Sequence, residues 1–234
     1  MGGQMSDCGQ LLRFYGEGQR IFGDQIACAD RSLRAGEITP LCQLMHGAGS
    51  DKGMGWHNYT VLYHKLFQSL MPKINIMLEV GIGTNYTDVP SNMGVDGIPG
   101  ASLRGWREYF SGSVICGGDV DDRILFEEDR IRTYKIDQLS KESIICFKSV
   151  MPHIWFDVII DDGLHTFEAN EQLYNNISDK LRPGGFYIIE DIITDEENIA
   201  KFERLLNQSG KNGFLYNLPS DTNFIDNAVA VLEH

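Results

Sequence analysis

Two apolar runs in this 234-residue chain end directly in acidic side chains. One run ends at Asp161 and Asp162, with His165 close behind, and the other ends at Glu190 and Asp191. Such runs are typical of buried parallel strands, and ligands of open α/β sheets bind just beyond the carboxyl ends of these strands. Carboxylates gathered there repel one another unless a positive charge separates them, and oxygen ligands suit Mg²⁺. We therefore expect a divalent cation at this edge.

Each of these residues also has a purely structural interpretation. A single acid at a strand end can cap the helix that follows. His165 could act in the same way beside Thr166. Asp162 could replace Asp161 as a ligand, although strand parity favours Asp161.

The elements that must position these side chains follow from residue 74 onward, where apolar runs alternate with amphipathic segments. This rhythm predicts a doubly wound α/β sheet. The expected strands are 74–80, 113–118, 133–136, 155–160, 186–189, 214–216 and 228–232, and the expected helices are 101–110, 141–150, 167–181 and 196–208.

Residues 1–72 carry no strand pattern and are expected to form a helical N-terminal extension, with residues 73–234 as the main domain. Apolar residues predict helices near 11–15, 41–45 and 60–70. A glycine-rich polar stretch, 49–59, precedes the last of them and could face the site.

Gly81 and Gly83 follow the first predicted strand and allow a tight turn against a ligand. A tight turn alone explains such a pair equally well. A dinucleotide fingerprint needs a third glycine where Tyr86 stands, which disfavours a nicotinamide-dependent dehydrogenase.

Acids also close the next two predicted strands. Asp119 stands where doubly wound folds bind a ribose diol, and Asp137 with Gln138 could contact an adenine edge. Together with Glu79 before the glycine turn, they predict a nucleoside-containing cofactor.

The composition excludes several classes of partner. The formal net charge of −13 argues against nucleic acid and anionic membranes. Five cysteines without CxxC spacing indicate a reducing compartment, which we expect to be the cytoplasm. No apolar run has the length of a membrane span.

Several motifs together resemble the class I S-adenosylmethionine (SAM) dependent methyltransferases, in particular the metal-dependent sugar O-methyltransferases of macrolide tailoring and a related cephalosporin-tailoring enzyme. The segments that carry the resemblance are 50–53, 57–59, 79–83, 100–106, 161–165 and 181–185.

The resemblance implies a seven-stranded sheet with an antiparallel last strand, and SAM at the ends of the first three strands. It implies Mg²⁺ ligands at Asp161, Glu190 and Asp191, with His165 and Asp161 as catalytic residues. The implied cofactor-binding residues are Glu79, Gly81, Gly83, Asn85, Ser102, Arg104, Asp119, Asp137 and Gln138.

Some of these roles have alternatives. Arg104 could hold the SAM carboxylate or pair with Glu108 one helical turn on. His57 and Tyr59 could line the substrate pocket or simply pack in the core.

The expected function is O-methylation of a sugar or glycosylated small molecule by a homo-oligomer. The alternatives are a non-catalytic protein that binds SAM or a nucleotide, and an NAD-dependent oxidoreductase.

Overall fold

The computed structural model describes residues 13–15, 38–53, 56–68, 70–218, 222–223 and 225–234. Leu11 and Leu12, which belong to the first predicted helix, lie outside these residues. Arg13–Tyr15 form β1, an edge strand antiparallel to β8. The helix prediction is wrong for these three residues, because aromatic side chains also suit an edge strand.

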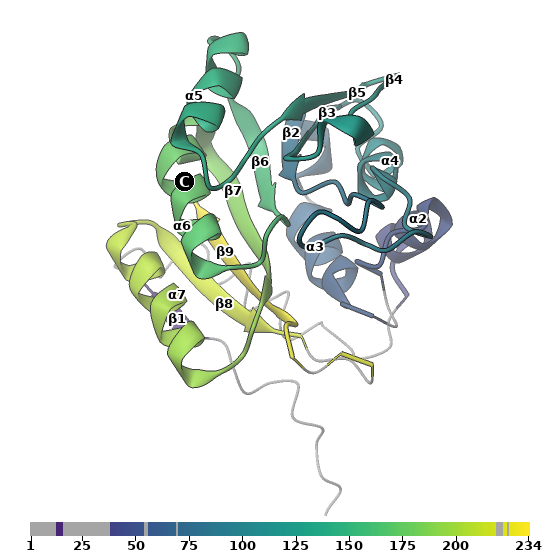
Figure 1. Cartoon of the computed structure of the whole chain (residues 1–234). Helices are drawn as coiled ribbons and strands as arrows, with labels where there is room; N and C mark the ends of the chain where they lie inside the picture. The colour runs from purple at the N-terminus through teal and green to yellow at the C-terminus, as the bar shows by residue number, and fades with distance from the viewer. Residues whose placement is uncertain (1–12, 16–37, 54–55, 69, 219–221, 224) are drawn as a thin grey trace, which may run out of the picture.

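A single mixed sheet forms the centre of the described chain (Figure 1). Its order is β1-β8-β9-β7-β6-β2-β3-β5-β4, and β9 runs antiparallel between β7 and β8. The strands are β2 (Ile76–Val80), β3 (Val114–Asp119), β4 (Glu127–Glu128), β5 (Ile131–Lys135), β6 (Phe156–Asp161), β7 (Leu181–Ile192), β8 (Asn212–Asn217) and β9 (Ala228–Glu233). The doubly wound α/β prediction is confirmed. The two strands beyond the expected seven, β1 and β4, lie at the edges.

Helices cover both faces of the sheet, as Figure 1 shows. One hydrophobic core joins the sheet to α2 (Pro40–Ala48), α3 (Tyr59–Phe67) and α4 (Ala101–Tyr109). The other joins it to α5 (Lys141–Val150), α6 (Phe167–Ile177) and α7 (Glu196–Gln208). We call these the α3 face and the α6 face. Short 3₁₀ turns occur at Met71–Lys73, Asp122–Ile124 and Ser178–Lys180.

The chain between α6 and the apolar part of β7 differs from the prediction. Helix α6 ends at Ile177 rather than at residue 181, and β7 begins at Leu181 rather than at residue 186, with a shift of its register against β6 between Leu181 and Phe186. Gly184 takes the left-handed φ that glycine permits.

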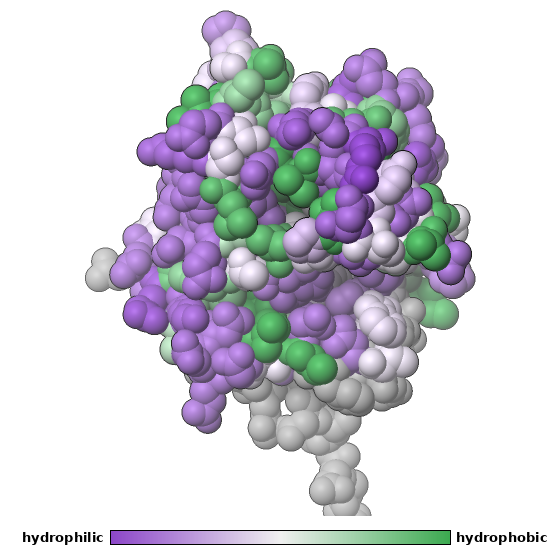
Figure 2. Space-filling view, in the orientation of Figure 1, coloured by the Kyte–Doolittle hydropathy of each residue, from purple (hydrophilic) through white to green (hydrophobic). Residues whose placement is uncertain are grey.

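One face of the molecule is mainly polar (Figure 2). Figure 2 shows a face on which hydrophilic residues predominate, with apolar ones between them. Within the described ranges, no helix has both the length and the apolar character that crossing a bilayer requires.

Candidate active site

A pocket of about 310 Å³ opens at the carboxyl ends of the parallel strands, where ligands of such sheets bind. Two sets of predicted or neighbouring residues line it. The glycine-turn side contributes Gly81, Gly83, Ser102, Asp119, Asp137 and Gln138, and the acidic side contributes Lys52, His57, Tyr59, Asp162, His165, Glu190 and Asp191.

Gly81 brings the two sides together. Its φ is +92°, and a Cβ at this position would lie 1.8 Å from the backbone oxygen of Asp162. Only glycine permits this approach, so the turn after β2 touches the loop after β6. Asp119 supports the same turn by accepting the backbone N–H of Ile82 at 3.0 Å.

Glu79 does not line the pocket, so the geometry does not support its prediction as a cofactor contact. Its side chain is fully buried and accepts hydrogen bonds from Ser102 and, at 2.5 Å, from the Trp106 indole. Burial raises the pKa of Glu79, while Lys52 opposes that rise. The carboxylate therefore anchors α4 beneath the glycine turn.

Two further predicted cofactor contacts also lie outside the pocket lining, Asn85 and Arg104. The Arg104 guanidinium pairs with Glu128 at 2.7 Å, and the alternative partner Glu108 pairs instead with Arg107. The β4–β5 hairpin supplies Glu128, and this edge hairpin was not predicted.

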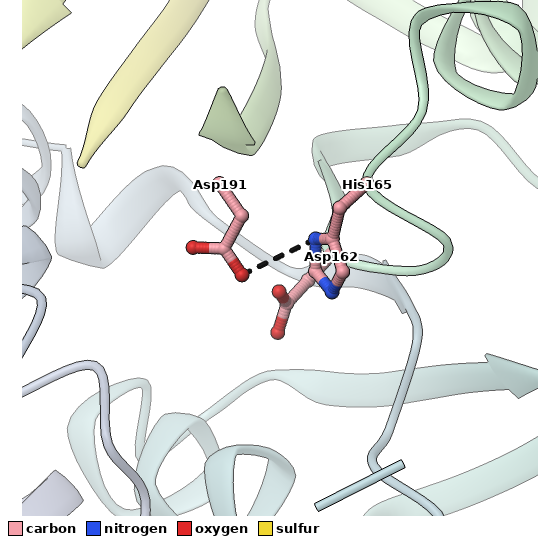
Figure 3. A group of neighbouring side chains, drawn as sticks. All are labelled: Asp162, His165 and Asp191. Carbon is pink, nitrogen blue, oxygen red and sulfur yellow. Dashed lines mark ion pairs between the residues drawn. The ribbon is translucent and has the colours of Figure 1, made fainter. Parts of the chain in front are cut away.

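Asp162, His165 and Asp191 form the cluster drawn in Figure 3. Each offers one ligand atom, and these atoms lie within 4.8 Å of one another. Asp191 Oδ2 is 3.2 Å from His165 Nδ1. Both His165 and Asp191 have a left-handed backbone, with φ of 58° and 53°. That conformation costs a non-glycine residue roughly 1–3 kcal/mol and is concentrated at functional sites.

Asp161 does not belong to this cluster, so the geometry does not support its prediction as a metal ligand and catalytic residue. Its side chain is fully buried toward the α6 face, where it accepts a hydrogen bond from Gln138 and lies 3.5 Å from the Tyr187 hydroxyl. Burial raises the pKa of Asp161 to about 6. Asp162, one residue later, points to the opposite side, into the cluster with His165 and Asp191.

Gln138 lines the pocket, but its amide is already engaged. It donates to Asp161 and accepts the backbone N–H of Leu164 at 2.7 Å. It therefore fixes the loop that carries Asp162 and His165, and its predicted contact with an adenine edge stays a prediction.

The N-cap of α6 is Thr166, so the alternative role of His165 as that cap is not needed.

Lys52 lies among three carboxylates from three strand ends. Its ammonium pairs with Asp162 at 2.5 Å, with Glu190, and with Glu79 at 3.6 Å. Burial alone would lower the pKa of Lys52, but these carboxylates outweigh it and raise the pKa well above its ordinary value. This internal cation balances part of the acidic charge. The other Glu190 oxygen accepts the Tyr63 hydroxyl at 2.5 Å.

His57 and Tyr59 line the pocket, and both also contact Asp191. The Tyr59 hydroxyl donates to Asp191 at 2.5 Å, and His57 Nδ1 lies 3.3 Å from the same carboxylate. Their predicted contact with substrate stays a prediction. Sequence reasoning left out Tyr63 as a site residue, although Tyr59 and Tyr63 stand at the i, i+4 spacing that aligns side chains on a helix.

Comparisons with known proteins find relatives of this chain, although no family model matches it. The 8-demethyl-8-alpha-L-rhamnosyl tetracenomycin-C 2'-O-methyltransferase of Streptomyces olivaceus is 32% identical over 158 residues, 68% of this chain and 39% of that protein. A 3'-O-methyltransferase of the same organism, acting on the 2-methoxy-rhamnosyl compound, is 33% identical over 177 residues, 75% of this chain and 43% of that protein. The chain thus spans about two fifths of these relatives.

A solved structure of MycE, a methyltransferase of the mycinamycin pathway in complex with Mg and SAH, superposes with a TM-score of 0.64. It is 25% identical, and the match covers 84% of this chain and 55% of that one. The glycine turn and the acidic strand ends have the places that the resemblance implies. With these relatives, they show that the chain belongs to the class I SAM-dependent methyltransferases and is a homologue of their sugar O-methyltransferases.

Proposed function

We propose that this chain transfers a methyl group from SAM to a hydroxyl of a sugar or of a glycosylated small molecule. The observation that carries the proposal is a single pocket lined on one side by Gly81, Gly83 and Asp119 and on the other by the cluster of Asp162, His165 and Asp191. The first side suits a nucleoside cofactor and the second suits an oxygen-rich acceptor. Cytoplasmic location and homo-oligomeric assembly are part of the proposal.

Asp162 and Asp191 would hold a divalent cation, Mg²⁺ in this proposal, with Glu190 beside them. Carboxylate oxygens within 4.8 Å of one another on separate strand ends fit such an ion. When bound, it supplies Lewis-acid stabilisation of the negative charge that develops on the acceptor oxygen. The Lys52 ammonium, which pairs with Asp162 and Glu190, adds a positive charge beside the same site.

His165 is the proposed general base. Asp191, 3.2 Å from Nδ1, favours the tautomer with the proton on that nitrogen and leaves Nε2 to accept the hydroxyl proton. The acceptor oxygen then forms a bond to the methyl carbon while the carbon–sulfur bond of SAM breaks. The products are the methyl ether, S-adenosylhomocysteine and a proton held at His165.

A radiolabelled methyl-transfer assay tests the proposal. Purified chain is incubated with methyl-labelled SAM and a panel of sugars, glycosides and catechols, with Mg²⁺ or with EDTA. We expect transfer to a saccharide hydroxyl that EDTA abolishes. Tight SAM binding without transfer to any acceptor would favour the non-catalytic binding protein, and binding of NAD but not SAM would refute the proposal.

A further inference from the structure

Helix α3 presents two tyrosine hydroxyls to two adjacent carboxylates. The Tyr59 hydroxyl donates to Asp191 and the Tyr63 hydroxyl donates to Glu190, each at 2.5 Å. The tyrosines stand one helical turn apart, with ring centroids separated by 6.2 Å. One rigid element thus contacts both acids at the end of β7.

The end of β7 is shaped to allow this arrangement. Side chains alternate between the faces of a strand, so Glu190 and Asp191 would normally point in opposite directions. The register of β7 against β9 shifts between Ile189 and Ile192, and Asp191 has a φ of 53°. A bulge of this kind re-aims a side chain, and here both carboxylates line one pocket.

Packing explains the Tyr63 ring but not its hydroxyl. The Tyr63 ring lies against Phe67 and Trp106 in the aromatic part of the α3-face core, where phenylalanine would pack equally well. The hydroxyl instead meets a carboxylate that is 1% exposed. Without that donor, one oxygen of Glu190 would be buried without its partner.

We propose that Tyr59 and Tyr63 are positioning residues that orient Asp191 and Glu190 and thereby set the affinity of the pocket for a divalent cation. This inference rests on the metal site of the proposed function. Groups that orient ligating carboxylates commonly change metal affinity by about 10–100-fold when they are removed.

Binding of Mn²⁺ to the full chain, measured by electron paramagnetic resonance and calorimetry, provides the test. We expect Tyr59→Phe and Tyr63→Phe each to weaken Mn²⁺ binding by about tenfold or more, with the affinity for S-adenosylhomocysteine unchanged within about twofold. The matched control is Tyr109→Phe, because that hydroxyl contacts His64 at 2.8 Å and no acid of the pocket. The control should bind Mn²⁺ like the parent chain.

The outcomes separate the two proposals. If the parent chain binds no Mn²⁺, the proposed function fails and this inference fails with it. If the parent binds Mn²⁺ and both variants bind it equally well, only the positioning role is refuted, even where their melting temperatures fall. Should Tyr63→Phe fail to fold, Tyr59→Phe decides alone, since Tyr59 lines the pocket.

Discussion

Replacement of Asp161 by asparagine should stabilise the protein at neutral pH. The carboxyl group is fully buried, and burial raises its pKa to about 6, against about 3.9 in an unfolded chain. The folded state therefore holds the proton more tightly than the unfolded state. The stability that this provides is fully present below about pH 4 and is lost as the pH rises through about 6. Asparagine keeps an oxygen for the Gln138 amide and carries no charge to bury.

The size of the effect follows from the two pKa values. A difference of about 2 units corresponds to about 3 kcal/mol once both states are ionised, near pH 7.5. At pH 5 the folded carboxyl is still largely protonated, and the same linkage leaves about 1.5 kcal/mol. Asp161→Asn should therefore exceed the parent in unfolding free energy by more at pH 7.5 than at pH 5.

Urea unfolding in EDTA, at several pH values between 5 and 7.5, measures this difference without interference from bound metal. A variant that is less stable than the parent at pH 7.5, or a difference that does not change with pH, would refute the reasoning.

Mn²⁺ binding to asparagine variants distinguishes the two neighbouring acids. Asp161→Asn should retain Mn²⁺ binding, whereas Asp162→Asn should lose it by more than about tenfold, because only Asp162 faces the cluster.

Three further predictions concern Gly81, His165 and Cys116. Gly81→Ala should reduce S-adenosylhomocysteine affinity in calorimetry by at least about tenfold and lower the melting temperature, because its Cβ would collide with the Asp162 backbone; unchanged binding would contradict the close contact. His165→Asn should slow methyl transfer by about 10²–10⁴-fold without weakening SAM binding, and near-normal turnover would rule out the base. Burial raises the pKa of Cys116 to about 12, so native protein at pH 8 should leave Cys116 unalkylated by iodoacetamide in peptide mapping, while exposed Cys146 reacts.

Local patterns in the sequence were sufficient to predict the sheet and the pocket's position. The apolar runs predicted β2, β3, β5 and β6 close to their observed bounds, whereas β7 extends beyond the predicted residues 186–189 at both ends. They could not predict β4, a two-residue edge strand of charged residues, because nothing in its composition favours a strand. Because β4 was not predicted, the pairing of Arg104 with Glu128 on that strand could not be predicted either.

The choice between Asp161 and Asp162 failed for a different reason. Strand parity places consecutive side chains on opposite faces, but it does not say which helices cover each face. In the structure, Asp161 faces the α6 side beside Tyr187, and Asp162 follows the parity of Ile160 toward the α3 side. The choice depends on long-range packing of the N-terminal helices, which no local pattern in β6 contains.

The chemistry of this site belongs to the α3 face. Glu79, Asp162 and Glu190 come from three different strand ends, yet all three meet the Lys52 ammonium, which lies in the segment just before α3. The one acid that should point to the other face, Asp191, is turned back by its left-handed backbone and held by Tyr59. The sheet therefore supplies the acids, and residues 52–63 supply the donors that hold them together. A domain boundary at residue 72 would assign these acids and their donors to different units, although the proposed chemistry requires both.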